Sequence, residues 1–315
     1  MQAVIIRRLI HTVIVLFVLS LIVFMLIYFI PGDPVITMIG ADATKEEVDA
    51  LRSELGLDKP LLVQYSNWLL KVLQGDLGKS ILYREEVIDL IKKRMPITLY
   101  LGFLALIITT VFGTLAGIIC AVRRGTLLDA VVTVFANFGI AVPVFWLGII
   151  GIYAFAIELG WLPVQGYTSP FKDFWLSTQQ AIMPVICLAV TPLASIARQA
   201  RSAMLEVIQQ DYIRTAWSKG LKERVIIMRH ALKNALIPVV TLLGMQARFV
   251  IGGSVLVETV FNIPGMGRLI VRSVFDKDFT IVQGAVLVTA IVVAMANLIV
   301  DISYAYLDPR VSYEE

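Results

Sequence analysis

Long apolar stretches alternate with short charged segments along most of this chain. Five stretches without any charge cover residues 12–32, 95–122, 130–157, 174–197 and 279–300. A sixth, 234–257, contains a single charge, Arg248. Because about 20 apolar residues in a helix cross the hydrocarbon core of a bilayer, the pattern predicts an all-α integral membrane protein with six spans and both termini on one side.

The composition excludes several classes of water-soluble protein. Hydrophobic residues make up 58% of the 315 positions and charged residues only 16%, and the mean hydropathy is +0.82. A soluble fold with this balance would expose apolar surface that it has no means to cover. The net charge of +3 is too small to indicate a nucleic-acid partner. The two cysteines lie in apolar runs and the two histidines lie far apart, so we expect neither a disulfide framework nor a metal site.

Basic residues are distributed unequally between the two sides of the predicted spans. Both chain ends, the loop near residue 123 and the loop 198–233 together carry thirteen lysines and arginines, whereas the short loops on the opposite side carry four. Since such residues accumulate on the cytoplasmic side of a membrane, we expect both termini and the loop 198–233 to be cytoplasmic.

This topology divides the chain into four parts. The N-terminal transmembrane helix, 1–32, is too long for a cleaved leader and has no small-residue cleavage site. Residues 33–94 form an outer segment, 95–307 form the transmembrane core with the cytoplasmic loop 198–233, and 308–315 form a cytoplasmic tail.

The outer segment carries the signals of three short amphipathic helices. Thr44 and Glu47 form a capping box at the start of the first, and Pro60 begins the second. The third has acids at 85–86 in its first turn and bases at 92–94 in its last turn, as the helix dipole favours. This segment either packs on the helix bundle or docks an extracellular partner.

The loop 198–233 contains a short helix with two different faces, begun by Asp211 as N-cap and ended by Gly220 in a left-handed conformation. One face is apolar and holds Tyr212, Ile213, Ala216 and Trp217. The other is polar and holds Arg214, Thr215, Ser218 and Lys219. Such a helix either fits a groove on another protein or lies on lipid headgroups.

The loop resembles the coupling loop of ABC importer membrane subunits. The matching segments are Asp211-Tyr212-Ile213-Arg214-Thr215-Ala216, Lys219-Gly220-Leu221 and Arg229-His230-Ala231-Leu232-Lys233-Asn234-Ala235-Leu236-Ile237-Pro238. Ala216 and Gly220 match the general Glu-Ala-Ala-x-x-x-Gly motif, whereas Arg214 and Thr215 replace its first two positions. The sequence of these segments is similar to that of the dipeptide, oligopeptide and nickel branch of the family.

The resemblance extends over nearly the whole chain. Further matching segments are Pro31-Gly32-Asp33-Pro34, Pro143-Val144-Phe145-Trp146, Glu258-Thr259-Val260-Phe261, Pro264-Gly265-Met266-Gly267 and Asp308-Pro309-Arg310. The chain is similar to the first of the two permease subunits of such a transporter, the one with the long outer segment.

The resemblance implies a type I importer fold, in a bacterial or archaeal cell membrane, and a transport role without catalysis. Two ATP-binding subunits would bind ATP and Mg²⁺, a second, homologous permease subunit would complete the pathway, and an extracellular solute-binding protein would deliver the cargo. The loop helix 211–220 would seat in a groove of one ATPase. The cargo implied is a di- or oligopeptide, with nickel chelates and glutathione as alternatives.

We expect this chain to bind no cofactor of its own. Gly75-Asp76-Leu77-Gly78-Lys79-Ser80 ends like a phosphate-binding loop, but Leu73 stands where that motif requires a glycine. The segment also follows no predicted strand, which the motif needs as its structural context.

Arg248 is the one full charge deep within a predicted span. A charge there costs around 2.5–3.5 kcal/mol on insertion scales, so its side chain should face protein or water. Gly244 and Gly252 lie one turn to either side and leave room around it. Arg248 either lines the pathway and holds a peptide carboxylate or pairs with the companion permease subunit.

Other polar residues in or near the spans have two interpretations each. Asn297 and Asp301 share one face of the sixth helix and either bound the inner mouth of the pathway or hydrogen bond to another helix. Glu258 is either an outer-gate contact or a solvated helix end. Pro184 and Pro192 either break the fourth span beside a transport pathway or form tolerated kinks.

Two functions of other classes are alternatives to the importer. Gly252-Gly253-Ser254-Val255 faintly resembles a membrane serine-protease site, but neither histidine lies within a span to act as its base. An ion-coupled secondary carrier is the stronger rival, although the long amphipathic cytoplasmic loop favours an ATP-driven partner.

Overall fold

The computed structural model describes residues 2–29, 35–36, 44–54 and 56–307. Within these helices, the side chains of 2–5, 27, 29, 51, 54, 247–253 and 303–307 are outside the description. The matching segments at 31–34 and 308–310 and the predicted tail 308–315 lie outside the described residues.

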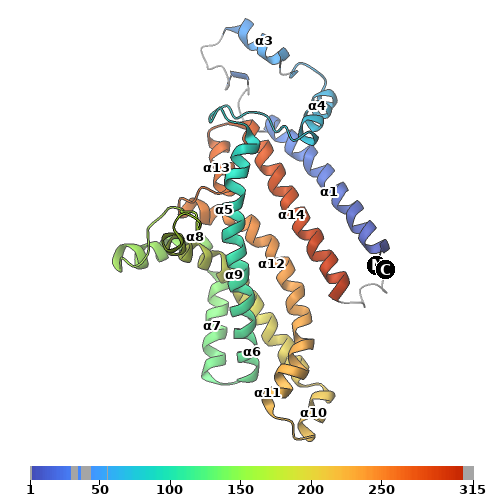
Figure 1. The fold of residues 1–315 in the computed structure, drawn as a ribbon, viewed down its shortest axis with the longest axis vertical. Coiled ribbons are helices and arrows are strands. Elements are labelled where there is room, and N and C mark those ends of the chain that lie inside the picture. Colours follow the sequence, from blue (N-terminus) through green and yellow to red (C-terminus); the bar gives the residue numbers. More distant parts are fainter. Residues whose placement is uncertain (1, 30–34, 37–43, 55, 308–315) are drawn as a thin grey trace. The chain divides into compact units, whose positions relative to one another are not determined.

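Apart from one isolated bridge between Lys79 and Glu86, the regular structure of the described residues is helical (Figure 1). The first half of the chain contains α1 (Gln2–Phe29), α3 (Lys45–Glu54), α4 (Leu61–Leu73), α5 (Val87–Ile108), the π-helical η1 (Thr109–Gly113), α6 (Thr114–Val122), α7 (Leu127–Ala141), α8 (Val144–Gly151) and the π-helical η2 (Ile152–Glu158). The second half contains α9 (Phe174–Ile208), α10 (Asp211–Ser218), α11 (Glu223–Val225), the π-helical η3 (Ile226–Ala231), α12 (Leu232–Val260), α13 (Met266–Phe275) and α14 (Phe279–Leu307).

Five helical segments of the described chain are long and apolar enough to cross a membrane, and a bent pair of helices raises the number to six. The pair is α7 and α8–η2, which meet at an angle of 107°. The break falls at Val142, whose backbone is extended, because the following Pro143 has no N–H and disfavours a helical residue before it. The stretch 130–157 was predicted as a single span, so this bend is a correction.

One further prediction about helices was wrong, and one open alternative is decided. The third outer helix is not separate: α5 begins at Val87, after the acids at 85–86, and continues through 92–94 into the membrane span. Of the two interpretations of Pro184 and Pro192, the broken span is excluded, because α9 runs unbroken for 35 residues with both prolines buried inside it.

The described chain separates into two compact units. Unit 1 comprises Met1–Ile97 and Pro264–Ile299, and unit 2 comprises Thr98–Ile263 and Val300–Glu315. In unit 1, residues of α5 and α13 pack around buried Ile281 of α14. The ring of Phe24 of α1 packs edge-to-face against Tyr65 and at a tilt against Trp68 of α4, with ring centroids 5.5 and 5.7 Å apart. The amphipathic helix α4 therefore covers the end of α1.

The predicted capping box of the outer segment is confirmed. Thr44 donates its backbone N–H to Oε2 of Glu47 at 2.8 Å, and the backbone N–H of Glu47 donates to Oγ1 of Thr44 at 3.4 Å. This exchange satisfies two of the unpaired donors at the start of α3.

Unit 2 is built around α9, which packs against α6, α7 and α12. The approach of α6 is close because Gly117 has no side chain: a Cβ there would lie 2.4 Å from the carbonyl oxygen of Ala197 and 2.6 Å from Cβ of Ala200. Small residues at such crossings allow two backbones to approach closely in lipid, where packing rather than a hydrophobic effect holds helices together.

Candidate functional site

The predicted loop helix is present as α10, which lies beyond the ends of α9 and α12 in Figure 1. Its N-cap is Gln210, which has an extended backbone and makes no side-chain capping bond. Asp211 is instead the first helical residue, so its prediction as N-cap was wrong by one position. In this position the Asp211 carboxylate still lies in the first turn, where the helix dipole favours a negative charge.

The predicted apolar face of α10 is divided between two environments. Ile213 and Ala216 are 0% and 6% exposed. They pack in one core with residues of α6, α9, η3 and α12, namely Ala121, Ala203, Met204, Ile226, Ala231 and Ala235. Tyr212 and Trp217, in contrast, are 43% and 48% exposed. Half of the face therefore anchors α10 to its own chain, and half remains open.

The open side of α10 is held in a defined orientation. The hydroxyl of Tyr212 accepts a hydrogen bond from Nδ2 of Asn234, at the start of α12, at 2.8 Å. Leu221, Val225 and Met228 are further exposed apolar side chains in the same loop. Exposed aromatic and aliphatic side chains of this kind are typical anchors of protein interfaces.

The polar face of α10 points away from the core. Thr215 and Ser218 donate their hydroxyls to the carbonyl oxygens of Asp211 and Arg214, one turn earlier. Arg214 forms an exposed ion pair with Asp211 at 3.5 Å. An exposed pair of this kind contributes little stability, so both side chains can be redirected toward a partner.

Gly220 ends the helix as predicted. Its φ of +71° lies in the left-handed region, and its N–H donates to the carbonyl oxygen of Trp217 at 2.9 Å. The N–H of Leu221 reaches back to Ala216 at 3.4 Å, which completes a helix-ending turn after Lys219.

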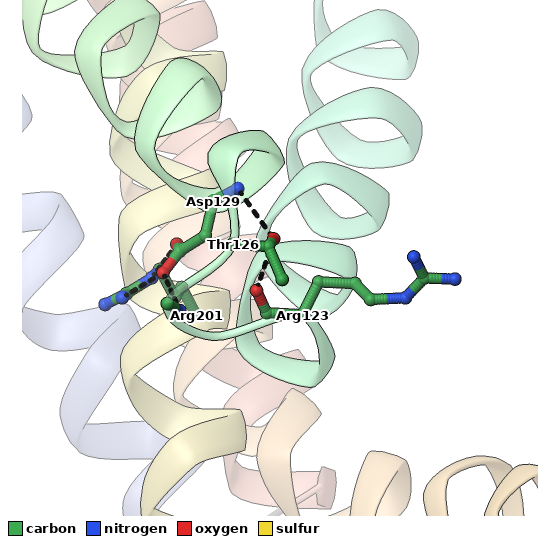
Figure 2. Close-up of polar contacts among 5 residues, drawn as sticks. Arg123, Thr126, Asp129 and Arg201 are labelled. Atoms are coloured by element: carbon green, nitrogen blue, oxygen red, sulfur yellow. Dashed lines mark hydrogen bonds and ion pairs between the residues drawn. The ribbon is translucent and has the colours of Figure 1, made fainter.

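An ion pair near this loop was missed by the sequence reasoning. Arg201 of α9 donates from Nε and Nη2 to the two carboxylate oxygens of Asp129 at 2.7 and 2.9 Å. Figure 2 shows the two side chains meeting between α7 and α9, with Thr126 capping α7 beside them. The N–H of Gly125 also donates to Asp129, at 3.1 Å. The pair therefore fastens the first turn of α7 to the part of α9 that leads to the loop.

The missed pair had a signal in the sequence. Thr126 and Asp129 have the spacing of an N-terminal capping box before an apolar run. Asp129 directly precedes the charge-free stretch that begins at Ala130, and Arg201 is one of many basic residues in the loop, so neither charge stands out in the sequence.

Glu258 is neither exposed nor solvated, so its interpretation as a solvated helix end was wrong. Its side chain is fully buried near the end of α12. Oε1 of Glu258 accepts a hydrogen bond from Oγ1 of Thr98 at 2.6 Å, within unit 2. A buried carboxyl group with a short bond of this kind fixes the end of α12 against the start of the unit.

The other candidate pathway residues lie on two helices. Gly244 is buried on α12, and Arg248 and Gly252 lie on the same helix with side chains outside the description. Asn297 and Asp301 lie four residues apart on α14, and both are half-buried. The Oδ1 atom of Asn297 is buried without a hydrogen-bond partner in the described part of the chain. Their roles in a pathway or at a subunit interface stay predictions.

No group of three or more His, Cys, Asp or Glu side chains among the described residues is arranged to hold a metal ion. The loop therefore presents a short helix, α10, that packs against the ends of α6, α9 and α12. Its exposed surface carries the aromatic side chains of Tyr212 and Trp217.

Two families of transport proteins match the chain. Residues 113–313 match the family described as "Binding-protein-dependent transport system inner membrane component". Residues 1–102 match its N-terminal companion, "Binding-prot-dependent transport system membrane comp, N-term".

Individual relatives match over their full length. A probable peptide ABC transporter permease protein, y4tP, of Sinorhizobium fredii is 40% identical over 98% of this chain and 99% of its own. A putative peptide transport system permease protein of Brucella abortus is 40% identical over 100% of both chains. The glutathione transport system permease protein GsiC of Escherichia coli O6:H1 is 39% identical over 98% of this chain and 99% of its own.

A solved structure shares the fold. A chain of the MetNI methionine ABC transporter, in an inward-facing conformation, aligns with a TM-score of 0.58 at 20% identity and covers 70% of this chain and 97% of that one. The similarity confirms the predicted helical architecture of an importer permease.

Proposed function

We propose a peptide-import role for this chain, which belongs to the family of binding-protein-dependent transport system inner membrane components. As a permease of this family it is a multi-pass inner membrane subunit without catalytic activity, and it works with an ATPase and a binding protein. Membership of this family excludes the alternative function of an ion-coupled secondary carrier. The cargo is a di- or oligopeptide, as the names of the full-length relatives support.

The assembly we propose contains two ATP-binding subunits and a second, homologous permease beside this one. Both termini and the loop 198–233 face the cytoplasm, in line with the thirteen basic residues on that side against four on the other. The ATPases would then meet the membrane subunit at α10.

The division of α10 into an anchored and an open half is the observation that carries this proposal. Ile213 and Ala216 tie the helix to the ends of α6, α9, η3 and α12, so a displacement of α10 moves those ends with it. Tyr212 and Trp217 supply the open surface for a groove of the ATPase. Closure of the ATPase pair on ATP would thereby shift the membrane helices between two states.

Truncation of Trp217 tests this coupling role. In the complete transporter, reconstituted in proteoliposomes, Trp217→Ala should lower ATP-driven uptake and ATPase co-purification about tenfold or more, as loss of an interface anchor does. The matched control is Trp175→Ala, which removes another exposed tryptophan at the far end of α9. Equal uptake by the two variants would contradict the proposal.

Glutathione is the second candidate cargo, since a glutathione permease is as similar as the peptide permeases. Uptake of a labelled dipeptide, measured with unlabelled tripeptide, glutathione or a nickel chelate as competitor, separates these cargoes. We expect the tripeptide to compete most strongly.

A further inference from the structure

Three arginines line one small cleft in unit 1. The cleft has a volume of about 50 Å³ and is lined by Tyr83, Arg94, Pro264, Gly265, Arg268, Leu269 and Arg272. It lies between the start of α5 and the first turns of α13, on the side of the chain that the basic-residue count assigns to the outside. Nothing in the coupling role of α10 uses it.

Arg94 lines the cleft, and one of its nitrogen atoms has no hydrogen-bond partner among the described residues. Its Nη1 atom donates to the carbonyl oxygen of Pro264 at 3.3 Å, which ties α5 to the turn before α13. Its Nε atom is buried and has no hydrogen-bond partner among the described residues. A buried donor without a partner is destabilising, and more so when the group is charged, so an added acceptor would be stabilising.

Arg272 is an exposed residue of the cleft lining. Its side chain is 60% exposed and pairs with Asp276, one turn later, at 3.4 Å. Such an exposed pair contributes little, and its geometry leaves the guanidinium group available to a second anion.

The start of α13 adds positive potential to the same place. Gly265 caps this ten-residue helix without a side-chain bond, and its first turn contains no acid. The positive end of the helix dipole is therefore not neutralised from within the helix.

We infer that this cleft binds a single carboxylate group from outside the membrane. Guanidinium groups match a carboxylate in two-pronged geometry. One water needs roughly 10–15 Å³ of such volume, so about 50 Å³ admits a group of a few heavy atoms and excludes a bulky headgroup. The inference rests on the proposed function: the carboxylate belongs either to an acidic side chain of the binding protein or to the C-terminus of the delivered peptide.

The test uses the complete transporter in nanodiscs and proteoliposomes with its binding protein. The binding protein is loaded with a peptide that ends in a free carboxylate or with the same peptide amidated at its C-terminus. The variants are Arg272→Gln and Arg94→Lys. The second keeps the positive charge but loses the two-pronged hydrogen bonding of the guanidinium group. The matched control is Lys92→Gln, which removes an exposed charge on α5 outside the cleft.

If the binding protein supplies the carboxylate, Arg272→Gln weakens its capture about tenfold with either peptide, and Arg94→Lys weakens it less. If the peptide supplies it, the wild type favours the free-acid peptide and the variants lose that preference. Capture and uptake equal to those of Lys92→Gln with both peptides would overturn the inference. A wild-type transporter that imports no peptide would instead overturn the proposed function, so the two failures are distinguishable.

Discussion

The two units hold distant parts of the sequence together by different means. In unit 1, the carboxylate of Asp278 accepts hydrogen bonds from Oγ of Ser80 at 2.6 Å and from the N–H of Leu82 at 3.1 Å. Gln283 donates to the carbonyl oxygens of Val23 and Phe24 on α1 at 3.3 and 3.2 Å. In unit 2, α6 and α9 instead pack in close contact, because Gly117 of α6 has no side chain.

The difference follows from what each unit must order. Unit 1 contains turns and short outer helices whose backbone groups need directed partners, and a buried carboxylate satisfies several of them at once. Unit 2 consists mainly of long helices that satisfy their own backbones, so close contact of small residues joins α6 to α9, and the buried bond between Thr98 and Glu258 is added at the end of α12. The ion pair of Asp129 with Arg201 is added where α7 begins and its first N–H groups need partners.

Removal of the Asp278 carboxylate should have the largest effect on stability. In Asp278→Ala, the Ser80 hydroxyl and the N–H groups of Leu82 and Ile281 lose their acceptor. Each buried group left unsatisfied costs roughly 1–3 kcal/mol. Thermal unfolding of the purified complex, together with proteolysis of the segment around Ser80, measures the loss. Asp89→Ala, which removes an exposed acid on α5, is the control; equal unfolding temperatures of the two variants would contradict this account of unit 1.

A methyl group at Gly117 should have an intermediate effect. In Gly117→Ala the new Cβ meets backbone atoms of Ala197 and Arg201, so α6 must move away from α9 at a cost of about 1–3 kcal/mol. Gly151→Ala is the matched control, since its nearest neighbour would be the sulfur of Met183 at 3.8 Å. Equal unfolding temperatures of Gly117→Ala and Gly151→Ala would show that close packing does not hold unit 2 together.

Protonation of Glu47 should have the smallest effect, and this effect should be local to α3. Hydrogen bonds from the backbone N–H and hydroxyl of Thr44 lower the pKa of Glu47 below its ordinary value. A lowered pKa in the folded state means that this bond stabilises α3 above the unfolded value of about 4.3 and that the contribution is lost as the pH falls through the lowered pKa. Hydrogen exchange of the α3 amides, corrected for intrinsic rates, measures this loss. Glu47→Gln should abolish the pH dependence, and an unchanged profile in that variant would refute the assignment.

Patterns that depend on a few neighbouring residues were readable from the sequence. The apolar runs located the membrane helices, Thr44 and Glu47 located the start of α3, and Gly220 located the end of α10. Each of these signals reflects local hydrogen bonding or a backbone angle that one residue type favours.

Features that depend on tertiary partners were not readable in this way. Pro143 bends its span by 107° while Pro184 and Pro192 lie in an unbroken helix, because packing decides whether a proline is tolerated. Likewise, helical periodicity grouped Ile213 with Trp217, and only the core beneath α10 separates the buried residue from the exposed one.

The length of α9 has a consequence for motion. At 1.5 Å per residue its 35 residues extend about 52 Å, well beyond a hydrocarbon core of about 30 Å. At this length, a tilt of the whole helix by about 10° about one end would displace the other end by about 9 Å. Ala203 and Met204, near the end of α9, share a core with α10. A small rotation of α9 within the membrane would therefore move the loop helix by a much larger distance.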